Sequence, residues 1–427
     1  MATQIEKEGD EELILHRLPL PKLMITAGGV YAAQGIFGGL TFQGLPTVLR
    51  ANEVGLDLIG FVFLAMLPWA LKFLWAPFLE RLRITKENQR RSRVIILTGQ
   101  FIAVALLILI AFLGFSSIPY LIGALILLAT IAATIDIPCD GFIVEQLTKK
   151  TRGWGNTAQI GGGYAGFMIG GGLFLWLNAT YDWMIASLGM AICVFLFSLA
   201  FLFFKETQPE KQKRIHKPSL VHAIVRPEIR FGILIMILYD IGIRVASGLS
   251  GPFMIDQGLS LETVGIVSGV GGTVAGLIGA ILGGWVVREV GALHTVLAVI
   301  ILQVIVLLFF YSFALNYSSS QAALMAVVIL QSLVMGLGFV AIYSLLMGFI
   351  SLKQAGVDFS IFQCVDALVA ALGGFGAGQI AGLFGYGTTF GVTAAMTALS
   401  FVIVLILVRF ATNQITSNHS ETINEKT

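Results

Sequence analysis

The sequence is poor in charged residues, histidine and cysteine, and each shortage excludes a class of protein. Only 12% of its 427 residues are charged, whereas a soluble domain carries about a quarter, so a water-soluble fold would leave most of the apolar surface uncovered. The five histidines lie in tails, loops or at the ends of apolar segments, which excludes haem held by histidine pairs inside a membrane. The three cysteines are far apart and predict neither a disulfide framework nor a metal site.

Patterns of catalysis and nucleotide binding are missing as well. The sequence has no Ser/His/Asp arrangement, and its glycine-rich runs at 161–172 and 371–378 are neither preceded by a strand nor followed by a P-loop lysine. The polar, acidic first twenty residues do not have the form of a cleavable signal peptide. Basic segments are short and adjoin apolar runs. We therefore expect no enzyme, no metal site and no nucleic-acid partner.

Apolar sequence is what the chain has in abundance. Hydrophobic residues make up 57% of it, and it contains 49 glycines. About 20 apolar residues span a bilayer as a helix, and small residues let such helices pack closely. The apolar runs, read between charged or Pro/Gly breaks, predict twelve spans, at 22–46, 56–79, 94–115, 119–144, 157–179, 183–204, 229–255, 261–287, 293–315, 321–350, 360–384 and 388–410.

The distribution of lysine and arginine predicts the orientation of these spans. With a cytoplasmic N-terminus, 23 of the 26 basic residues fall on the cytoplasmic side and one, Arg50, falls on the other; Lys72 and Arg244 lie within spans. Basic loops are retained in the cytoplasm during insertion. We therefore expect a cytoplasmic tail at each end, and removing one span would scramble the alternation.

The chain divides into two halves around its longest polar loop. Segment 205–228 is basic and separates six spans from six, so we interpret it as a cytoplasmic linker between six-helix bundles at 22–204 and 229–410, with tails at 1–21 and 411–427. Duplicated membrane bundles keep weak internal repeats. GLDL at Gly55 and GLSL at Gly258 open spans two and eight, and GFI at Gly141 and Gly348 ends spans four and ten. Their offsets, 203 and 207 residues, favour a duplication.

Ionisable residues inside spans are the candidates for function, because a charge at bilayer depth is costly and meets a cavity, a partner or a pathway. They are Lys72, Asp136, Asp140, Asp240, Arg244 and Asp366. Asp240 and Arg244, four residues apart, share one face of span seven. One interpretation is a self-neutralising pair. The other is that the planar guanidinium of Arg244 binds an anionic ligand while Asp240 holds it or exchanges a proton.

Asp136 and Asp140 repeat the same spacing on span four. Two like charges on one helix face repel, so at least one carboxyl is expected to hold a proton, as a proton carrier does. In the alternative, Lys72 of span two neutralises one carboxylate and the other reaches cytoplasmic water. Lys72 itself, and Asp366 in span eleven, are further candidates for proton coupling, and structural roles remain open for both.

Three stretches resemble a known group of proteins. They are LPWALKFLWAPFLER at 67–81, AATIDIPCDGFIVEQL at 132–147 and RGWGNTAQIGGGYAGFMIGGG at 152–172. The chain resembles, over most of 20–410, the muropeptide-permease and acetyl-CoA-transporter group of the major facilitator superfamily. The form RGWGN at 152–156 is most similar to the branch that imports siderophores such as rhizobactin and pyochelin. Ile135 and Cys139 depart from the residues usual in the group, which weakens the substrate assignment but not the fold.

The resemblance implies an all-α membrane protein of the major facilitator fold, with twelve transmembrane helices and both termini cytoplasmic. It further implies a monomer in the lipid bilayer of the bacterial inner membrane that imports a ferric siderophore with the proton gradient and no cofactor. The alternatives are a muropeptide permease of the same group, or efflux of a siderophore or drug. A receptor is disfavoured because no sizeable soluble signalling domain is present in the sequence.

In this fold, spans one, four, seven and ten line the cavity between the halves. The resemblance therefore adds residues of spans one and ten to Arg244 and Asp240 as candidates for binding the ligand. Packing between helices explains these added residues equally well. They are Gln34, Gln331 and Tyr343 for hydrogen bonds and Tyr31 or Phe37 for an aromatic face. The loop after span two usually carries an acidic-basic gate, here Glu80 with Arg81, unless these charges only anchor the loop.

Overall fold

The computed structural model of the chain describes residues 19–84, 89–114, 118–146, 152–202, 220–316, 320–350 and 355–424. Within these ranges, nine helices are long and apolar enough to cross a membrane, so the chain is a multi-pass membrane protein. The nine are Pro21–Ala51, Leu56–Leu74, Ser92–Leu113, Ile118–Ile143, Trp183–Leu202, Leu261–Val290, Ala292–Ala314, Gln321–Met347 and Val357–Leu407.

Several of the predicted spans are helices built from consecutive pieces. In the first, α1 (Leu20–Gly39) runs through a π-helical turn, η1 (Leu40–Gly44), into α2 (Leu45–Ala51). The other pieces up to residue 202 are α3 (Leu56–Gly60), η2 (Phe61–Met66), α4 (Leu67–Leu71), η3 (Lys72–Leu74), α5 (Ala76–Arg83), α6 (Ser92–Leu113), α7 (Ile118–Gln146), α8 (Arg152–Met168), η4 (Ile169–Leu173), α9 (Phe174–Thr180) and α10 (Trp183–Leu202).

The second part of the chain is also helical wherever the structure describes it. Its elements are α11 (Leu220–Val225), α12 (Pro227–Asp256), α13 (Leu261–Val264), η5 (Gly265–Gly271), α14 (Gly272–Val290), α15 (Ala292–Ala314), α16 (Gln321–Met347) and α17 (Ala355–Asn424). Helix α17 breaks at Gly385, whose φ of 80° is open to glycine but strained for other residues. This break lies between the predicted spans 360–384 and 388–410. Beyond it, the segment predicted as a C-terminal tail is helical as far as Asn424.

Two long helical segments are not among the nine. The run α8–η4–α9 covers 152–180 and is rich in glycine, and α12 carries the charges of Asp240 and Arg244. Glycines and charged side chains lower the mean hydropathy of a helix but do not change its length. Each of these two segments is long enough to span a bilayer.

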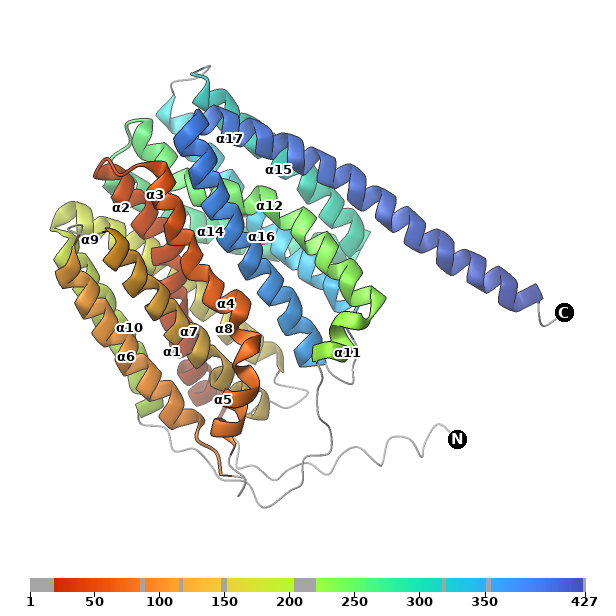
Figure 1. Cartoon of the computed structure of the whole chain (residues 1–427), viewed down its shortest axis with the longest axis horizontal. Coiled ribbons are helices and arrows are strands. Elements are labelled where there is room, and N and C mark those ends of the chain that lie inside the picture. The colour runs from red at the N-terminus through yellow and green to blue at the C-terminus, as the bar shows by residue number, and fades with distance from the viewer. Residues whose placement is uncertain are drawn as a thin grey trace.

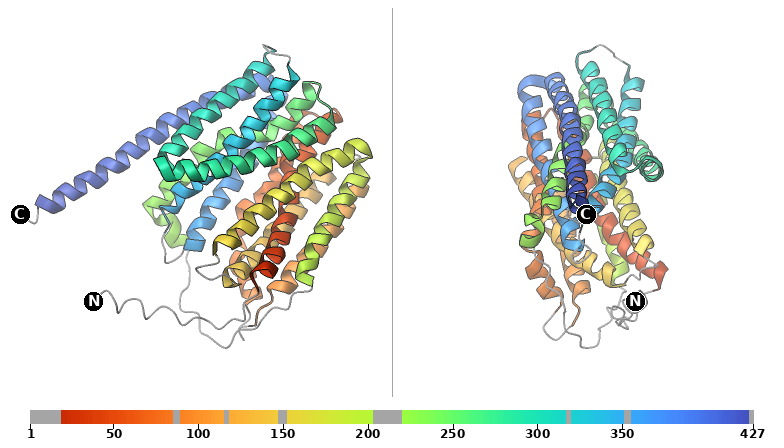
Figure 2. Two further views of the ribbon diagram at one scale, coloured as in Figure 1. Left: turned by 180° about the vertical axis from the view of Figure 1, so that it is seen from behind. Right: turned by 90° about the vertical axis from the view of Figure 1, so that its right-hand side faces the viewer.

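The helices pack in two groups, which Figures 1 and 2 show side by side, one red to yellow and the other green to blue. In the first group α1 packs on α8, and α6 lies against α7 and α10. In the second, α17 packs on α12 and α15, and α16 packs on α14 and α15. The linker predicted at 205–228 is described only from Leu220, so its first part lies outside the described residues. The boundaries of the two halves stay a prediction.

Glycine allows helices to approach closely, both within a group and between groups. A Cβ on Gly162 would lie 2.5 Å from the carbonyl oxygen of Gly28, which brings α8 against α1. Between the groups, a Cβ on Gly378 of α17 would lie 2.6 Å from the Cα of Gly60 in α3. Small residues let membrane helices gain dispersion energy by backbone contact, and these contacts place the seam between the groups.

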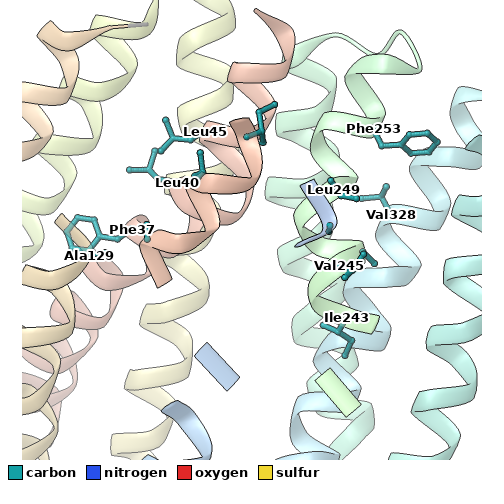
Figure 3. Close-up of a cluster of buried hydrophobic side chains, with 14 of the residues drawn as sticks. Phe37, Leu40, Leu45, Ala129, Ile243, Val245, Leu249, Phe253 and Val328 are labelled. Atoms are coloured by element: carbon teal, nitrogen blue, oxygen red, sulfur yellow. The ribbon is translucent and has the colours of Figure 1, made fainter. Parts of the chain in front are cut away.

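Buried apolar side chains fill the space between helices on both sides of this seam. Figure 3 shows part of this core, with one set of side chains on the chain from α1 to α2 and on α7, and another on α12 and α16. The labelled members are Phe37, Leu40, Leu45, Ala129, Ile243, Val245, Leu249, Phe253 and Val328. Phe37 is 2% exposed, so the predicted aromatic face of this residue is covered by packing.

Candidate functional site

Arg244 is the centre of a buried ionic cluster in the second group of helices. Its Nε donates to Asp240 Oδ2 at 2.9 Å, one helical turn away on α12, as the spacing predicts. Its Nη2 contacts Asp366 Oδ1 on α17, and Tyr343 of α16 donates to Asp366 Oδ2 at 3.0 Å. Asp240 is fully buried and the Arg244 side chain is 9% exposed, against 17% for Asp366. The carboxylate that solvent and a ligand reach more easily is therefore Asp366.

Aromatic rings from both groups of helices face the guanidinium of Arg244. Its Cζ lies 5.6 Å from the ring centre of Phe42, in η1, and 5.2 Å from that of Phe339, on α16. Both distances fall in the range of cation–π attraction. Three residues beyond Arg244, Ser247 accepts a hydrogen bond from Gln331 Nε2 at 3.1 Å. The arrangement offers a planar cation, flat apolar faces and polar groups at the seam between the groups.

A second ionic cluster lies in the first group of helices. Lys72 Nζ donates to Asp136 Oδ2 at 2.6 Å, a contact that joins η3 to α7. The Lys72 side chain is 11% exposed and that of Asp136 is 10% exposed. One turn further along α7, Asp140 Oδ1 accepts a hydrogen bond of 2.5 Å from the hydroxyl of Tyr31 on α1. The interpretation in which Lys72 neutralises one carboxylate is thus confirmed for Asp136, and Asp140 has a tyrosine partner instead of a cation.

The two clusters have the same chemical composition. Each contains one basic side chain, two aspartates and one tyrosine hydroxyl that donates to an aspartate. With every acid and base ionised, each cluster carries one net negative charge in a buried setting, where an uncompensated charge is expensive. One proton, or one ligand cation, would neutralise each cluster.

Several predicted site residues lie elsewhere than the sequence suggested. Tyr31, predicted to bind the ligand, donates to Asp140 in the cluster predicted for proton coupling. Asp366, predicted for proton coupling, contacts Arg244 in the cluster predicted for ligand binding. Tyr343 donates to Asp366 of the Arg244 cluster, and Gln331 donates to Ser247, three residues beyond Arg244; ligand binding by these two residues stays a prediction. Gln34 of α1 is half-buried, and its Nε2 makes no hydrogen bond with any described residue.

Glu80 of the predicted acidic-basic gate pairs with Arg83, two residues beyond Arg81. Glu80 accepts two hydrogen bonds from Arg83, at 2.7 and 2.8 Å, while Arg81 is exposed. Residues three apart on a helix face the same way, and adjacent residues do not. The Arg83 side chain is 4% exposed and packs over Gly141 of α7, where a Cβ would lie 2.8 Å from its Cζ. A gating role for this loop stays a prediction.

An ion pair that was not predicted from the sequence joins the two groups of helices. Arg50 at the end of α2 donates to both oxygens of Asp256 at the end of α12, at 2.7 and 2.8 Å. Both side chains are about a quarter exposed, and they border a cavity of about 580 Å³ that Asp57 and Tyr386 also line. The sequence held one signal for this site: Arg50 is the one basic residue that the predicted topology places on the non-cytoplasmic side of the membrane.

Comparisons with known proteins identify the family and the fold. The model of the Major Facilitator Superfamily matches residues 23–287. An anhydromuropeptide permease of Escherichia coli strain K12 is 26% identical over 394 residues, which cover 87% of this chain and 77% of that protein. An uncharacterized protein of Haemophilus influenzae is 26% identical over 361 residues, 81% of this chain and 84% of that one.

Solved transporter structures share the fold. The nucleoside transporter NupG, as its D323A mutant, superposes with a TM-score of 0.71 at 13% identity, over 91% of this chain and 99% of its own. A bacterial homolog of the human lysosomal transporter Spinster, in an inward-facing and occupied conformation, gives 0.69 at 13% identity, over 91% and 96%. Similarity at this level of identity speaks only for architecture.

The family resemblance read from the sequence is therefore confirmed at the level of the superfamily and of similarity to muropeptide permeases, whereas these relatives do not support the siderophore branch. The family model covers more than half of the sequence, and the helices fold as in known transporters. The chain belongs to the Major Facilitator Superfamily and is a secondary transporter, not an enzyme.

Proposed function

We propose that the protein is a proton-coupled permease that imports anhydromuropeptides, fragments of the bacterial cell wall, by alternating access. The observation that carries this proposal is Arg244, a buried guanidinium held at the seam between the two groups of helices by Asp240 and Asp366. A permanent cation at membrane depth is costly and marks a pathway for an anion or a proton.

Arg244 suits a substrate carboxylate. A guanidinium binds a carboxylate through two parallel hydrogen bonds, and muropeptides carry carboxylates on their peptide part. Asp366 occupies part of this fork and is the more exposed of its two partners. A proton on Asp366 would weaken its hold on Arg244 and free Nη2 for the substrate. The rings of Phe42 and Phe339 supply flat surfaces on which a sugar or peptide can pack.

Coupling to protons follows from the charge balance of the two clusters. Each has two aspartates to one basic side chain, so each gains electrostatic stability by taking up one proton. In the first cluster the proton would reside on the Asp136 and Asp140 pair, in the second on Asp240 or Asp366. The proton gradient then supplies the energy, and no cofactor is required.

The choice of cargo follows from relatives. The E. coli protein that is similar to this chain is an anhydromuropeptide permease, and a muropeptide permease is one of the alternatives that the sequence leaves open. That alternative now replaces siderophore import as the preferred function, because the similar proteins whose cargo is named are described as transporting an anhydromuropeptide or a nucleoside.

For the architecture, we propose twelve spans in two six-helix halves, with both termini in the cytoplasm of a monomer in the bacterial inner membrane. Splitting α17 at Gly385 and adding 152–180 and α12 to the nine candidates yields twelve segments. The bias of 23 basic residues to one supports the orientation. Labelling of single cysteines placed at each end, in intact cells and in inverted vesicles, tests it.

The test of the cargo uses purified protein in liposomes with an imposed proton gradient, acidic outside. Uptake of labelled anhydromuropeptide is compared with uptake of a ferric siderophore and of a nucleoside, with and without an uncoupler. We expect accumulation of the muropeptide alone, abolished by the uncoupler, and weak uptake of a muropeptide whose carboxylates are amidated. Equal uptake of the amidated compound would remove Arg244 from substrate binding, and accumulation of the siderophore instead would restore the first prediction.

A further inference from the structure

The aromatic ring of Phe63 crosses the seam between the two groups of helices. The residue belongs to η2, in the first group, and is 1% exposed. In the second group, a Cβ on Gly374 of α17 would overlap the Cγ of Phe63, and a Cβ on Gly248 of α12 would lie 3.0 Å from its Cζ. The near end of the ring therefore rests on α17 and its far end on α12. We call Gly248 and Gly374 the glycine socket.

Phe63 is connected to the Arg244 cluster through Phe42. The ring centres of Phe42 and Phe63 are 6.0 Å apart, within the range of aromatic pairs, and the other neighbour of the Phe42 ring is the guanidinium of Arg244. Gly248 follows Arg244 by four residues, so the two lie one turn apart on the same face of α12. The glycine socket therefore adjoins the proposed substrate site, and a ligand that takes the place of Phe42 on Arg244 would remove a neighbour of Phe63.

Beyond Phe63, further contacts between the two groups follow one another along the seam. They are Gly60 with Gly378, Thr47 with Gly251, and Arg50 with Asp256. Along α12, Gly248 is four residues from Arg244, whereas the positions of the later contacts, 251 and 256, are seven and twelve residues away. Phe63 is therefore the member of this series next to the Arg244 cluster, and the Arg50 pair, beside the cavity of about 580 Å³, is the farthest.

We propose that Phe63 is a positioning residue for transport, whose ring closes the seam between the Arg244 cluster and the Arg50 cavity, holds Phe42 against the guanidinium, and leaves the glycine socket when the seam opens on that side. An apolar constriction closes a pathway because it excludes water. Glycine offers the ring no side chain to interlock with, so the ring can slide out as the two groups separate. The role in transport rests on the proposed function, whereas the seal does not.

Phe61 is the matched control for Phe63. It lies two residues earlier on η2, and its ring centre is 4.9 Å from that of Phe375 on α17, edge to face. Unlike Phe63, it is 38% exposed. Both aromatic residues thus join the same two helical segments, one inside the seam and one at its outer surface. Loss of the Phe61 ring removes an aromatic contact between the groups without opening the seam.

Thiol labelling tests the seal without any substrate. The reporter is Phe339→Cys, beside Arg244, in a chain whose three native cysteines are replaced by serine. A membrane-impermeant maleimide is added to right-side-out vesicles, which expose the side of Arg50 in the predicted topology. We expect Phe63→Ala to raise the labelling severalfold and Phe61→Ala to leave it unchanged. Labelling that stays low in Phe63→Ala, at equal protein content, would overturn the seal.

A pair of complementary substitutions separates the seal from a folding defect. Gly374→Ala puts a methyl group where the Phe63 ring lies, so it should raise the labelling as well. Phe63→Leu shortens the side chain, and the double variant should therefore return toward the low labelling of the parent. High labelling that persists in the double variant would mean that the fit of ring and socket does not close the seam.

Uptake of labelled anhydromuropeptide into liposomes then tests the role in transport. We expect gradient-driven accumulation to fall severalfold in Phe63→Ala, because a seam that stays open on one side leaks, and to be kept in Phe61→Ala. Raised labelling with unchanged accumulation would overturn the role in transport and leave the seal. Absence of muropeptide uptake by the wild type would refute the proposed function, and the labelling results would still decide the seal.

Discussion

Replacing Arg244 with lysine removes the geometry of the cluster and keeps its charge. The guanidinium reaches Asp240 through Nε and Asp366 through Nη2, and its flat face lies 5.2 Å from the ring centre of Phe339. A lysine ammonium is a compact point charge on a flexible stem and cannot make this planar fork or stack in the same way. We therefore expect Arg244→Lys to insert normally and to bind substrate poorly.

The size of the effect follows from what is lost. One charge-assisted hydrogen bond contributes about 1.5–3 kcal/mol, and a cation–π contact contributes about 0.5–1 kcal/mol. The sum, about 2–4 kcal/mol, corresponds to a loss of roughly 30- to 700-fold in affinity, because each 1.4 kcal/mol is a factor of ten.

Initial rates of muropeptide uptake into liposomes over a range of concentrations measure this loss. Arg230→Lys is the matched control, since Arg230 lies on the same helix but is exposed and donates through Nε to one carbonyl, that of Ile224. We expect the control to transport as the wild type does, at equal protein content. Wild-type uptake by Arg244→Lys would show that neither the fork nor the stacking is used in transport, and the proposed binding site would fall.

Three further variants test other contacts. Reversing the charge of Arg50 or of Asp256 alone should open the cavity at that end to a cysteine reagent and slow uptake severalfold. Reversing both charges together should restore the closed cavity and the uptake rate. If the double variant restores neither, the pair does not join the groups. Asp140→Asn should abolish accumulation driven by the proton gradient and spare counterflow, and unchanged accumulation would remove Asp140 as a proton carrier. Gly166→Ala should lower the melting temperature, because its methyl group would overlap the Ala32 carbonyl of α1 and overpacking costs about 1–3 kcal/mol; Gly161→Ala, which meets nothing within 4 Å, should not, and an equal shift in both would contradict the packing argument.

Features that depend on neighbours along one helix could be predicted from the sequence. The pairing of Asp240 with Arg244 followed from a spacing of four residues, and the break of α17 near Gly385 followed from the end of an apolar run. Apolar runs of helical length indicate spans because a bilayer leaves backbone groups no other partner than each other. The superfamily could also be predicted, since short motifs and hydropathy survive where overall identity is low.

Contacts between helices were decided only by tertiary structure. Asp366 joins Arg244, Tyr31 joins Asp140, and Arg50 meets Asp256 across 206 residues, because each contact depends on how two helices are rotated and how far they slide along each other. Most spans are apolar on every side, so their composition does not say which face meets which neighbour. Close contacts at glycines, such as that of Gly162 with the Gly28 carbonyl and that of Gly378 with Gly60, set those rotations here.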